Sequence, residues 1–191
     1  MYRRLMQYEL EEEKRLVEAA KADAAAFAEL YQLYVDKIYT YCYYHTGDAE
    51  LAQDLTAATF LKAIEELPRF QWRGIPYSAW LYKVASNLIK KSRAAKPLVE
   101  LDEKIVSGQS DPDGELLAKE RTYKLRRALA QLPPAQKQVV LLRYDAGLSI
   151  KEVAKVMGKS QGAVKALLFR AIRNLRNSLT ELDDRIYVEL Q

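Results

Sequence analysis

The sequence predicts an all-α protein made of two small helical domains joined by a flexible acidic linker, with a helix-turn-helix as the C-terminal domain. Three observations support this fold class. The 191 residues include only 7 Gly and 6 Pro, too few for the turns of a many-stranded sheet. Apolar residues recur at steps of three and four along most of the chain. Hydrophobic residues make up 49% and charged residues 29%, a balance that supports a buried core.

The first predicted domain covers residues 14–96. Asp23 precedes an apolar stripe that ends near Gly47, and Asp48 precedes a second stripe that Pro68 stops. An aspartate at such a position accepts hydrogen bonds from the free N–H groups of the first helical turn. A glycine at the end of a helix adopts the left-handed conformation that closes it. Two helices joined at a tight corner are therefore expected.

The second predicted domain covers residues 115–179. A linker at 97–114, rich in Ser, Gly and Asp and without periodicity, precedes it, and an acidic tail at 180–191 follows it. Pro133 and Pro134 separate its first helix from its second, because proline cannot continue a helix but can begin one.

The segment LSIKEVAKVMGKSQGAVKALLFRAIRNLR has the spacing of a helix-turn-helix. Ala154 lies four residues before Gly158, and Val164 lies six residues after it. The small side chain allows close helix approach, the glycine makes the turn, and the valine anchors the second helix on the first. Ser149 and Ser160 are the expected N-caps of the two helices. An ordinary helical hairpin is the alternative interpretation.

Positive charge is concentrated in two parts of the chain. Residues 121–178 contain thirteen basic and two acidic residues, a net charge of +11, and residues 69–96 contain seven basic residues and no acidic one. Between them, residues 97–120 contain seven acidic and two basic residues. Clustered positive charge is typical of nucleic-acid binding, because it displaces counterions from phosphates. A merely solvated basic face is the alternative.

The second helix of the helix-turn-helix has a polar face. Recognition helices insert their N-terminal residues into the major groove, so Ser160, Gln161 and Lys165 are placed to reach base edges. Arg170 and Arg173 lie further along and are expected to contact phosphates.

Aromatic and basic residues alternate in the loop 68–77 and the helix after it, for which Ser78 is the expected N-cap. The set comprises Phe70, Trp72, Tyr77, Tyr82, Arg69, Arg73 and Lys83. Aromatic rings can stack on unpaired bases while cations hold the backbone, a combination suited to single-stranded nucleic acid. Trp80 falls on the apolar stripe and is expected in the core, whereas Trp72 is a candidate for stacking.

The sequence predicts no enzyme, no cofactor and no metal site. Cys42 and His45 are the chain's single cysteine and histidine, so neither an internal disulfide nor a Cys/His zinc site can form. We expect Cys42 in the core or at its boundary, and His45 at a helix end, as a cap or on the surface. No phosphate-binding or dinucleotide-binding glycine pattern occurs. Without an apolar signal segment or membrane-spanning run, a cytoplasmic protein is expected.

Four stretches, in order, resemble a bacterial sigma factor of the extracytoplasmic-function type, which has only regions two and four of the sigma-70 family. One stretch resembles the polymerase-binding part of region two: DAAAFAELYQLYVDKIYTYCYYHTGDAELAQDLTAATFLKAIEEL. A second resembles the helix of region two that recognises and melts the promoter: SAWLYKVASNLIKKSRAAK. The two halves of region four resemble LRRALAQLPPAQKQVVLLRY and LSIKEVAKVMGKSQGAVKALLFRA. The resemblance spans about residues 14–96 and 115–178.

The resemblance implies roles for three groups of residues. Core RNA polymerase would be bound by Asp54, Leu55, Thr59 and Phe60. Unpaired bases of the promoter −10 element would be captured and read by Arg69, Gln71, Trp72, Arg73, Tyr77, Lys83, Asn87, Lys90 and Lys91. Duplex DNA at the −35 element would be read by Ser160, Gln161, Lys165 and Ala166, with Arg170 and Arg173 beside them. The resemblance also implies three partners, namely core RNA polymerase, promoter DNA and an anti-sigma factor, and it implies that the protein does not insert into a membrane.

Two positions depart from the family pattern. Ala57-Ala58 stands where a polar pair such as Gln-Glu is common, and Ala166-Leu167 stands where Ser-Arg is frequent. A conventional helix-turn-helix regulator, with residues 1–96 as an effector or dimerisation domain, is the main alternative. A structural or RNA-binding adaptor is a further one.

Overall fold

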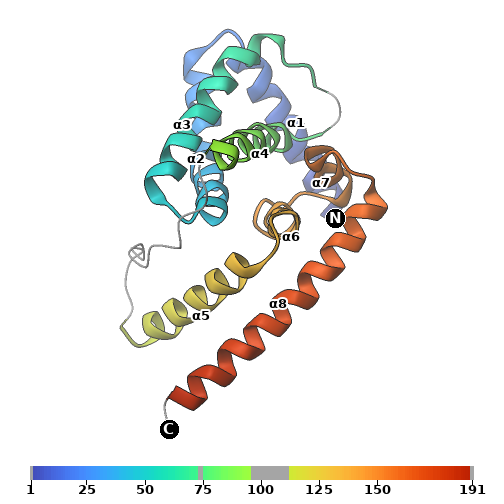
Figure 1. Ribbon diagram of the computed structural model, residues 1–191. Helices are drawn as coiled ribbons and strands as arrows, with labels where there is room; N and C mark the ends of the chain where they lie inside the picture. Colours follow the sequence, from blue (N-terminus) through green and yellow to red (C-terminus); the bar gives the residue numbers. More distant parts are fainter. Residues whose placement is uncertain (1, 73–74, 96–111, 190–191) are drawn as a thin grey trace.

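The computed structural model describes residues 2–72, 75–95 and 112–189, and this part of the chain is helical with short connections (Figure 1). The elements in order are α1 (Tyr2–Ala20), α2 (Ala24–Thr46), α3 (Ala49–Glu66), the 3-10 turn η1 (Leu67–Arg69), α4 (Tyr77–Ala95), α5 (Pro112–Gln131), α6 (Pro134–Val140), the π turn η2 (Leu141–Asp145), α7 (Ile150–Met157) and α8 (Gln161–Glu189). We refer to α1–α4 as the N-terminal unit and to α5–α8 as the C-terminal unit. Arg73 and nearly all of the linker 97–114 lie outside the described residues.

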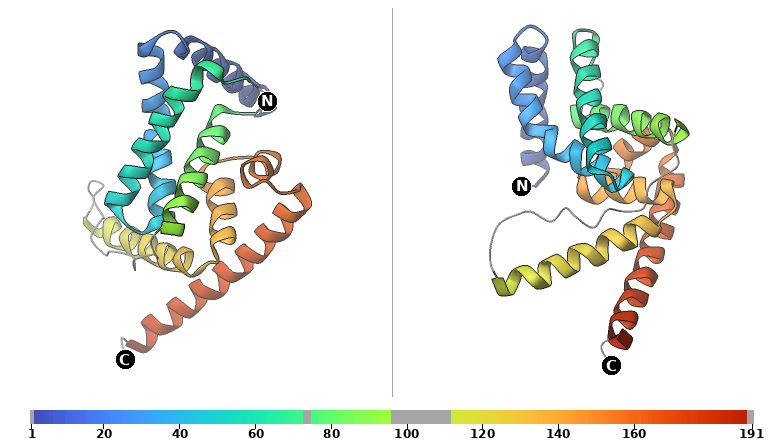
Figure 2. Two further views of the ribbon diagram at one scale, coloured as in Figure 1. Left: turned by 45° about the horizontal axis from the view of Figure 1, so that its top comes forward. Right: turned by 60° about the vertical axis from the view of Figure 1, so that its left-hand side comes forward.

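The corner between α2 and α3 forms as the sequence predicts. Asp23 Oδ1 accepts a hydrogen bond of 2.9 Å from Ala25 N, and Asp48 Oδ1 accepts one of 3.0 Å from Leu51 N. Gly47 adopts φ 72°, the left-handed conformation that closes α2. The two helices then pack against each other, with α1 and α4 completing the N-terminal unit (Figure 2).

The start of α4 differs from the prediction. The helix begins at Tyr77, so Ser78 lies inside its first turn and is not its N-cap. Instead, the backbone N–H of Ser78 donates a hydrogen bond of 3.2 Å to Oε1 of Glu13 in α1. The cap therefore comes from a residue 65 positions earlier in the chain, a distance over which sequence patterns give no signal.

The helix-turn-helix is confirmed. Ser149 and Glu152 form a reciprocal capping box at the start of α7, and Gly158 makes the turn with φ 64°. Ser160 Oγ accepts a hydrogen bond of 3.2 Å from Ala163 N at the start of α8. Ala154 is buried where the helices approach, and so is Val164, as its anchoring role requires.

Helix α8 is longer than the sequence suggests. We expect it to end near Leu179, before an acidic tail, but it continues to Glu189. Its 29 residues span about 43 Å, and its first part packs against α5, α6 and α7.

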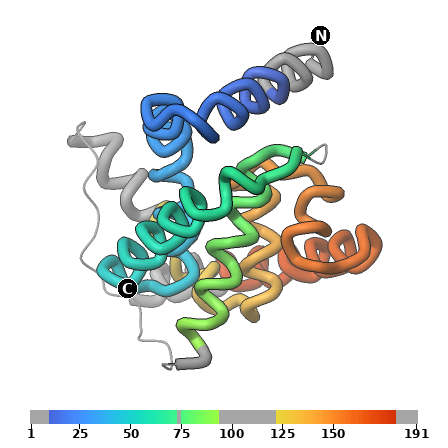
Figure 3. Tube along the Cα trace, turned by 90° about the horizontal axis from the view of Figure 1, so that it is seen from above, coloured from blue at the N-terminus to red at the C-terminus, as the bar shows by residue number. Residues whose placement is uncertain are grey.

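The two units lie in contact, with α4 against α7 and with α2 against α5 and α6 (Figure 3). Gln138 Nε2 of α6 donates a buried hydrogen bond of 2.6 Å to Ser86 Oγ of α4. The guanidinium of Arg126 in α5 lies 5.6 Å from the centroid of the Tyr43 ring in α2. Polar contacts thus join the two units, beside buried apolar residues of both units that form one continuous cluster.

His45 lies in the last turn of α2, at a helix end as predicted, but it is buried close to this junction and is not the cap or surface residue that we expected. Only 5% of the residue is exposed, and its ring packs edge-on against Tyr41 with centroids 4.6 Å apart. Burial, together with the positive charges of Arg93 and Lys137, lowers the pKa of His45 to about 3. The imidazole is therefore neutral in the folded protein at neutral pH. Cys42, one turn earlier, is fully buried, as predicted.

This buried histidine predicts a loss of stability in mild acid. The unfolded chain takes up a proton as the pH falls below the ordinary pKa of 6.5, whereas folded His45 stays neutral until about pH 3. The contribution of neutral His45 to the free energy of unfolding is complete above pH 6.5, and it is lost as the pH falls from 6.5 towards 3. Between pH 7 and pH 5 the loss amounts to about 2 kcal/mol.

Urea unfolding of the wild-type protein and of His45→Leu at both pH values measures this contribution. The variant should show a pH dependence smaller by about that amount. An identical pH dependence in the two proteins would mean that His45 is protonated equally in the folded and unfolded states.

Candidate nucleic-acid and polymerase interfaces

The N-terminal part of α8, with Ser160 just before it, presents a polar, basic face to solvent. The predicted −35 residues are all exposed: Ser160, Gln161, Lys165, Ala166, Arg170 and Arg173. The opposite face of the helix is buried through Val164, Ala171 and Leu175. The structure thus brings the six residues to one surface, with the first four at the end of the helix that a recognition helix inserts.

Phe169 belongs to the same surface, although the sequence analysis gives it no role. It lies one turn beyond Lys165 and one turn before Arg173, and 71% of it is exposed. An apolar ring at this position can pack on the 5-methyl group of thymine in the major groove. The sequence signal that could have identified Phe169 is an aromatic residue on the polar face of an amphipathic helix.

The predicted −10 residues form a second surface on the loop after α3 and on α4. The exposed members are Arg69, Gln71, Lys83, Asn87, Lys90 and Lys91. Trp72 is half-buried, Tyr77 is buried, and Arg73 falls outside the described residues. The exposed face is basic, as the charge pattern predicts.

Four aromatic rings pack together beneath this surface. Phe70 lies edge-on to Trp72, Tyr77 and Trp80, with centroid separations of 6.5, 5.2 and 5.5 Å. Only 1% of Tyr77 is exposed, and Tyr34 packs against its other side at 6.3 Å. In this arrangement Tyr77 supports the loop from the core and offers no face to a base. Trp72, at the edge of the cluster, is the ring closest to the role that we predicted.

A groove of about 780 Å³ lies between the −10 surface and α7. Arg69 and Lys83 contribute positive charge from one side, and Lys155 of α7 contributes it from the other. Phe70 and Trp80 supply apolar surface to the same groove. The helix-turn-helix therefore lies beside the −10 surface when the units are in contact.

The residues predicted to bind polymerase lie mainly in the core. Asp54 is exposed, but Leu55 and Phe60 are 7% and 4% exposed, and Thr59 is fully buried. The Phe60 ring packs edge-on against Tyr31 of α2 with centroids 4.7 Å apart. Sequence periodicity does not distinguish the faces of α3, because apolar side chains occur on all of its sides.

Different apolar residues of α3 face solvent. Leu61 is 61% exposed and Ile64 is 52% exposed, and Tyr31 of the neighbouring helix is 38% exposed. Large apolar side chains grouped on a surface are typical of protein–protein interfaces. The outer face of α3 is therefore the part of this helix that can contact a partner.

The fold and these surfaces define a two-unit helical DNA-binding protein with a helix-turn-helix. Family models match it twice, as sigma-70 region 2 over residues 30–96 and as sigma-70 region 4 over residues 122–175. The ECF RNA polymerase sigma factor SigL of Mycobacterium tuberculosis is 33% identical over 88% of this chain and 97% of its own length. The ECF RNA polymerase sigma factor BldN of Streptomyces coelicolor is 38% identical over 87% of this chain, which spans 65% of BldN.

Two solved structures share the fold. CnrH, in complex with the cytosolic domain of CnrY, has a TM-score of 0.65 and 22% identity over 91% of this chain and 97% of CnrH. The sigma factor RpoE from Bartonella quintana, in complex with the anti-sigma factor NepR, has a TM-score of 0.62 and 21% identity over 81% of this chain and 96% of RpoE.

The chain belongs to the ECF sigma factors of the sigma-70 family. Such proteins are transcription initiation factors and not enzymes. Across the ranges that the structure describes, we find no helix with the length and apolar character needed to cross a bilayer.

Proposed function

We propose that the protein directs core RNA polymerase to promoters by dividing three tasks among the surfaces described above. The outer face of α3 binds polymerase, the loop after α3 together with α4 holds unpaired −10 DNA, and the start of α8 reads −35 duplex. The observation that carries the proposal is that one chain presents an exposed helix-turn-helix face and a separate basic surface with an aromatic cluster beneath it. A regulator that reads duplex DNA alone has no need for the second surface.

The polymerase contact is made by exposed residues of α3 that neighbour the buried ones first predicted. Asp54 keeps its role, and Leu61 and Ile64 replace the buried side chains beside it. Ala57 is exposed, so its departure from the usual polar residue leaves this face of α3 more apolar.

For the −35 contact, the second departure from the family pattern has a limited effect. Leu167 is partly buried against the rest of the unit. Ala166 is exposed but has no hydrogen-bonding group, so base discrimination falls to Ser160, Gln161 and Lys165.

The two units have to separate for this function. Promoter elements two helical turns apart are about 70 Å from each other, whereas here α7 packs directly on α4. We infer that polymerase holds the units apart and that the free protein binds DNA weakly. An anti-sigma factor that holds the units together, as a partner in the cytoplasm, fits the same arrangement.

The decisive experiment mixes the protein with bacterial core RNA polymerase and a promoter library. Initiation at a defined subset of promoters, dependent on the protein, supports the proposal. Tight, specific binding to duplex operators at physiological salt without polymerase would favour the conventional regulator instead.

A pair of substitutions on α3 tests the polymerase surface. Leu61→Asp should weaken binding to core polymerase about fivefold or more, because it places a charge in an apolar contact, and should leave unfolding unchanged. Phe60→Ala should instead lower the free energy of unfolding by about 3–5 kcal/mol, because it opens a cavity in the core. Affinity for core polymerase and urea unfolding, measured on both variants, separate the two roles; unchanged affinity in Leu61→Asp would place the contact elsewhere.

A substitution in α8 tests duplex reading. Lys165→Ala should weaken recognition of the −35 element by about 1–3 kcal/mol if the lysine contacts a guanine edge. The loss should depend on the base pair at one position, measured by holoenzyme binding to −35 variants. An equal loss on every sequence would make Lys165 a phosphate contact and leave Gln161 and Ser160 to read bases.

A substitution in the loop tests strand opening. Trp72→Ala should slow promoter opening by removing a stacking face worth about 1–3 kcal/mol, yet leave the closed complex nearly intact. Permanganate reactivity of unpaired thymines in the holoenzyme complex measures opening, and a premelted promoter should restore it. Equal reactivity on intact promoters would mean that Trp72 only packs against Phe70.

A further inference from the structure

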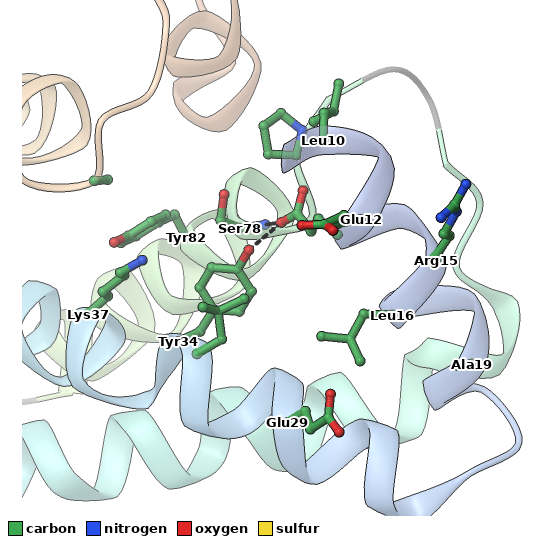
Figure 4. A pocket seen from close by; sticks show the side chains of 14 residues that line it. Leu10, Glu12, Arg15, Leu16, Ala19, Glu29, Tyr34, Lys37, Ser78 and Tyr82 are labelled. Carbon is green, nitrogen blue, oxygen red and sulfur yellow. Dashed lines mark hydrogen bonds between the residues drawn. The ribbon is translucent and has the colours of Figure 1, made fainter. Parts of the chain in front are cut away.

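Glu13 of α1 bonds to two elements that are distant from it in the chain. It accepts a hydrogen bond of 3.2 Å from Ser78 N at the start of α4 and a second from the hydroxyl of Tyr34 in α2. The dashed lines in Figure 4 mark both bonds, at the wall of a pocket between α1, α2 and α4. This residue lies outside the range 30–96 that matches sigma-70 region 2.

The bond from Ser78 to Glu13 pairs a backbone N–H at the start of α4. The first four N–H groups of a helix have no partner within the helix. Ala79 N donates to Pro76 O at 3.1 Å, and Glu13 accepts from Ser78. A carboxylate at this end also interacts favourably with the helix dipole. Glu13 thus caps the start of α4 from another helix, in place of a local N-cap side chain.

The carboxylate is partly withdrawn from water, and its hydrogen bonds offset only part of the effect of burial. Burial raises the pKa of Glu13, while the bonds from Tyr34 and from the backbone of Ser78 and Tyr77 act in the opposite direction. Glu152 of α7 adds a small raising effect across the unit boundary. The half-buried carboxylate thus holds two donors in place, the Tyr34 hydroxyl and the Ser78 N–H.

The capped turn is also where the −10 loop ends. Tyr77, the first residue of α4, packs against Phe70, which in turn packs against Trp72. A shift of the first turn of α4 would therefore move the aromatic cluster and the tryptophan at its edge.

We propose that Glu13 is a positioning residue for promoter opening, which holds the first turn of α4 so that the −10 loop is ready to receive an unpaired strand. It does not touch DNA in this role; it acts through Ser78 and Tyr77. The inference rests on the strand-opening role proposed above for the loop and α4, and adds to it a residue from α1.

The test compares the wild-type holoenzyme with three variants that carry substitutions at two positions of α1. Glu13→Met keeps the length of the side chain but has no acceptor, whereas Glu13→Gln keeps an oxygen that can accept from Ser78 N. Glu11→Met is the matched control, because Glu11 is exposed on the same helix. Loss of an N-cap has a typical effect of about fivefold, so promoter opening should slow about fivefold in Glu13→Met only.

The readouts separate positioning from general destabilisation. Permanganate reactivity follows opening on an intact promoter, and a premelted promoter should restore Glu13→Met to the wild-type level. Hydrogen exchange in peptides covering residues 75–80 should accelerate in Glu13→Met and not in Glu11→Met or Glu13→Gln, a result that does not depend on promoter activity. Equal opening rates for Glu13→Met and the wild type would overturn the inference, and so would an equal loss on the premelted template.

The same experiment distinguishes the inference from the function on which it rests. If wild-type holoenzyme fails to open any promoter, the proposed function fails. If Trp72→Ala slows opening but Glu13→Met does not, the loop keeps its role and only the positioning by Glu13 is wrong.

Discussion

The ring of Tyr77 lies where the loop after η1, the first turn of α4 and helix α2 meet. It packs against Phe70 on one side and Tyr34 on another, and it is nearly inaccessible to solvent. Since the adjacent N–H of Ser78 is held by Glu13, helix α1 is tied to the same point. The path of the loop after η1 and the direction of α4 both depend on this contact, because the loop ends beside it and the helix begins there.

Local signals in the sequence were sufficient for most of the fold. Asp23, Asp48 and Ser149 accept the backbone bonds expected of N-caps, and Gly158 makes the turn of the helix-turn-helix. The exposure of the residues predicted to read −35 DNA also followed from the sequence, because amphipathic spacing places Val164 inside and so leaves residues such as Lys165 outside. Such signals act within one helical turn, where spacing alone decides which groups meet.

Features that depend on distant contacts could not be predicted. The partners of α3 determine which of its apolar sides is buried, so Phe60 lies in the core while Leu61 faces solvent. The cap of α4 comes from α1, and Tyr77 is covered by Tyr34, a residue more than forty positions away. The contact between the units, including the bond from Gln138 to Ser86, likewise joins residues 52 positions apart.

The docking of α1 has a consequence for how the protein can be divided. The family model of sigma-70 region 2 matches from residue 30, whereas Glu13, which accepts the hydrogen bond from the first turn of α4, lies earlier in the chain. A chimera that exchanges region two at the family boundary would transplant the loop and α4 without their cap, and it would pair them with a foreign first helix. An exchange of region two in this sigma factor therefore has to include α1 if the contact between Glu13 and α4 is to be preserved.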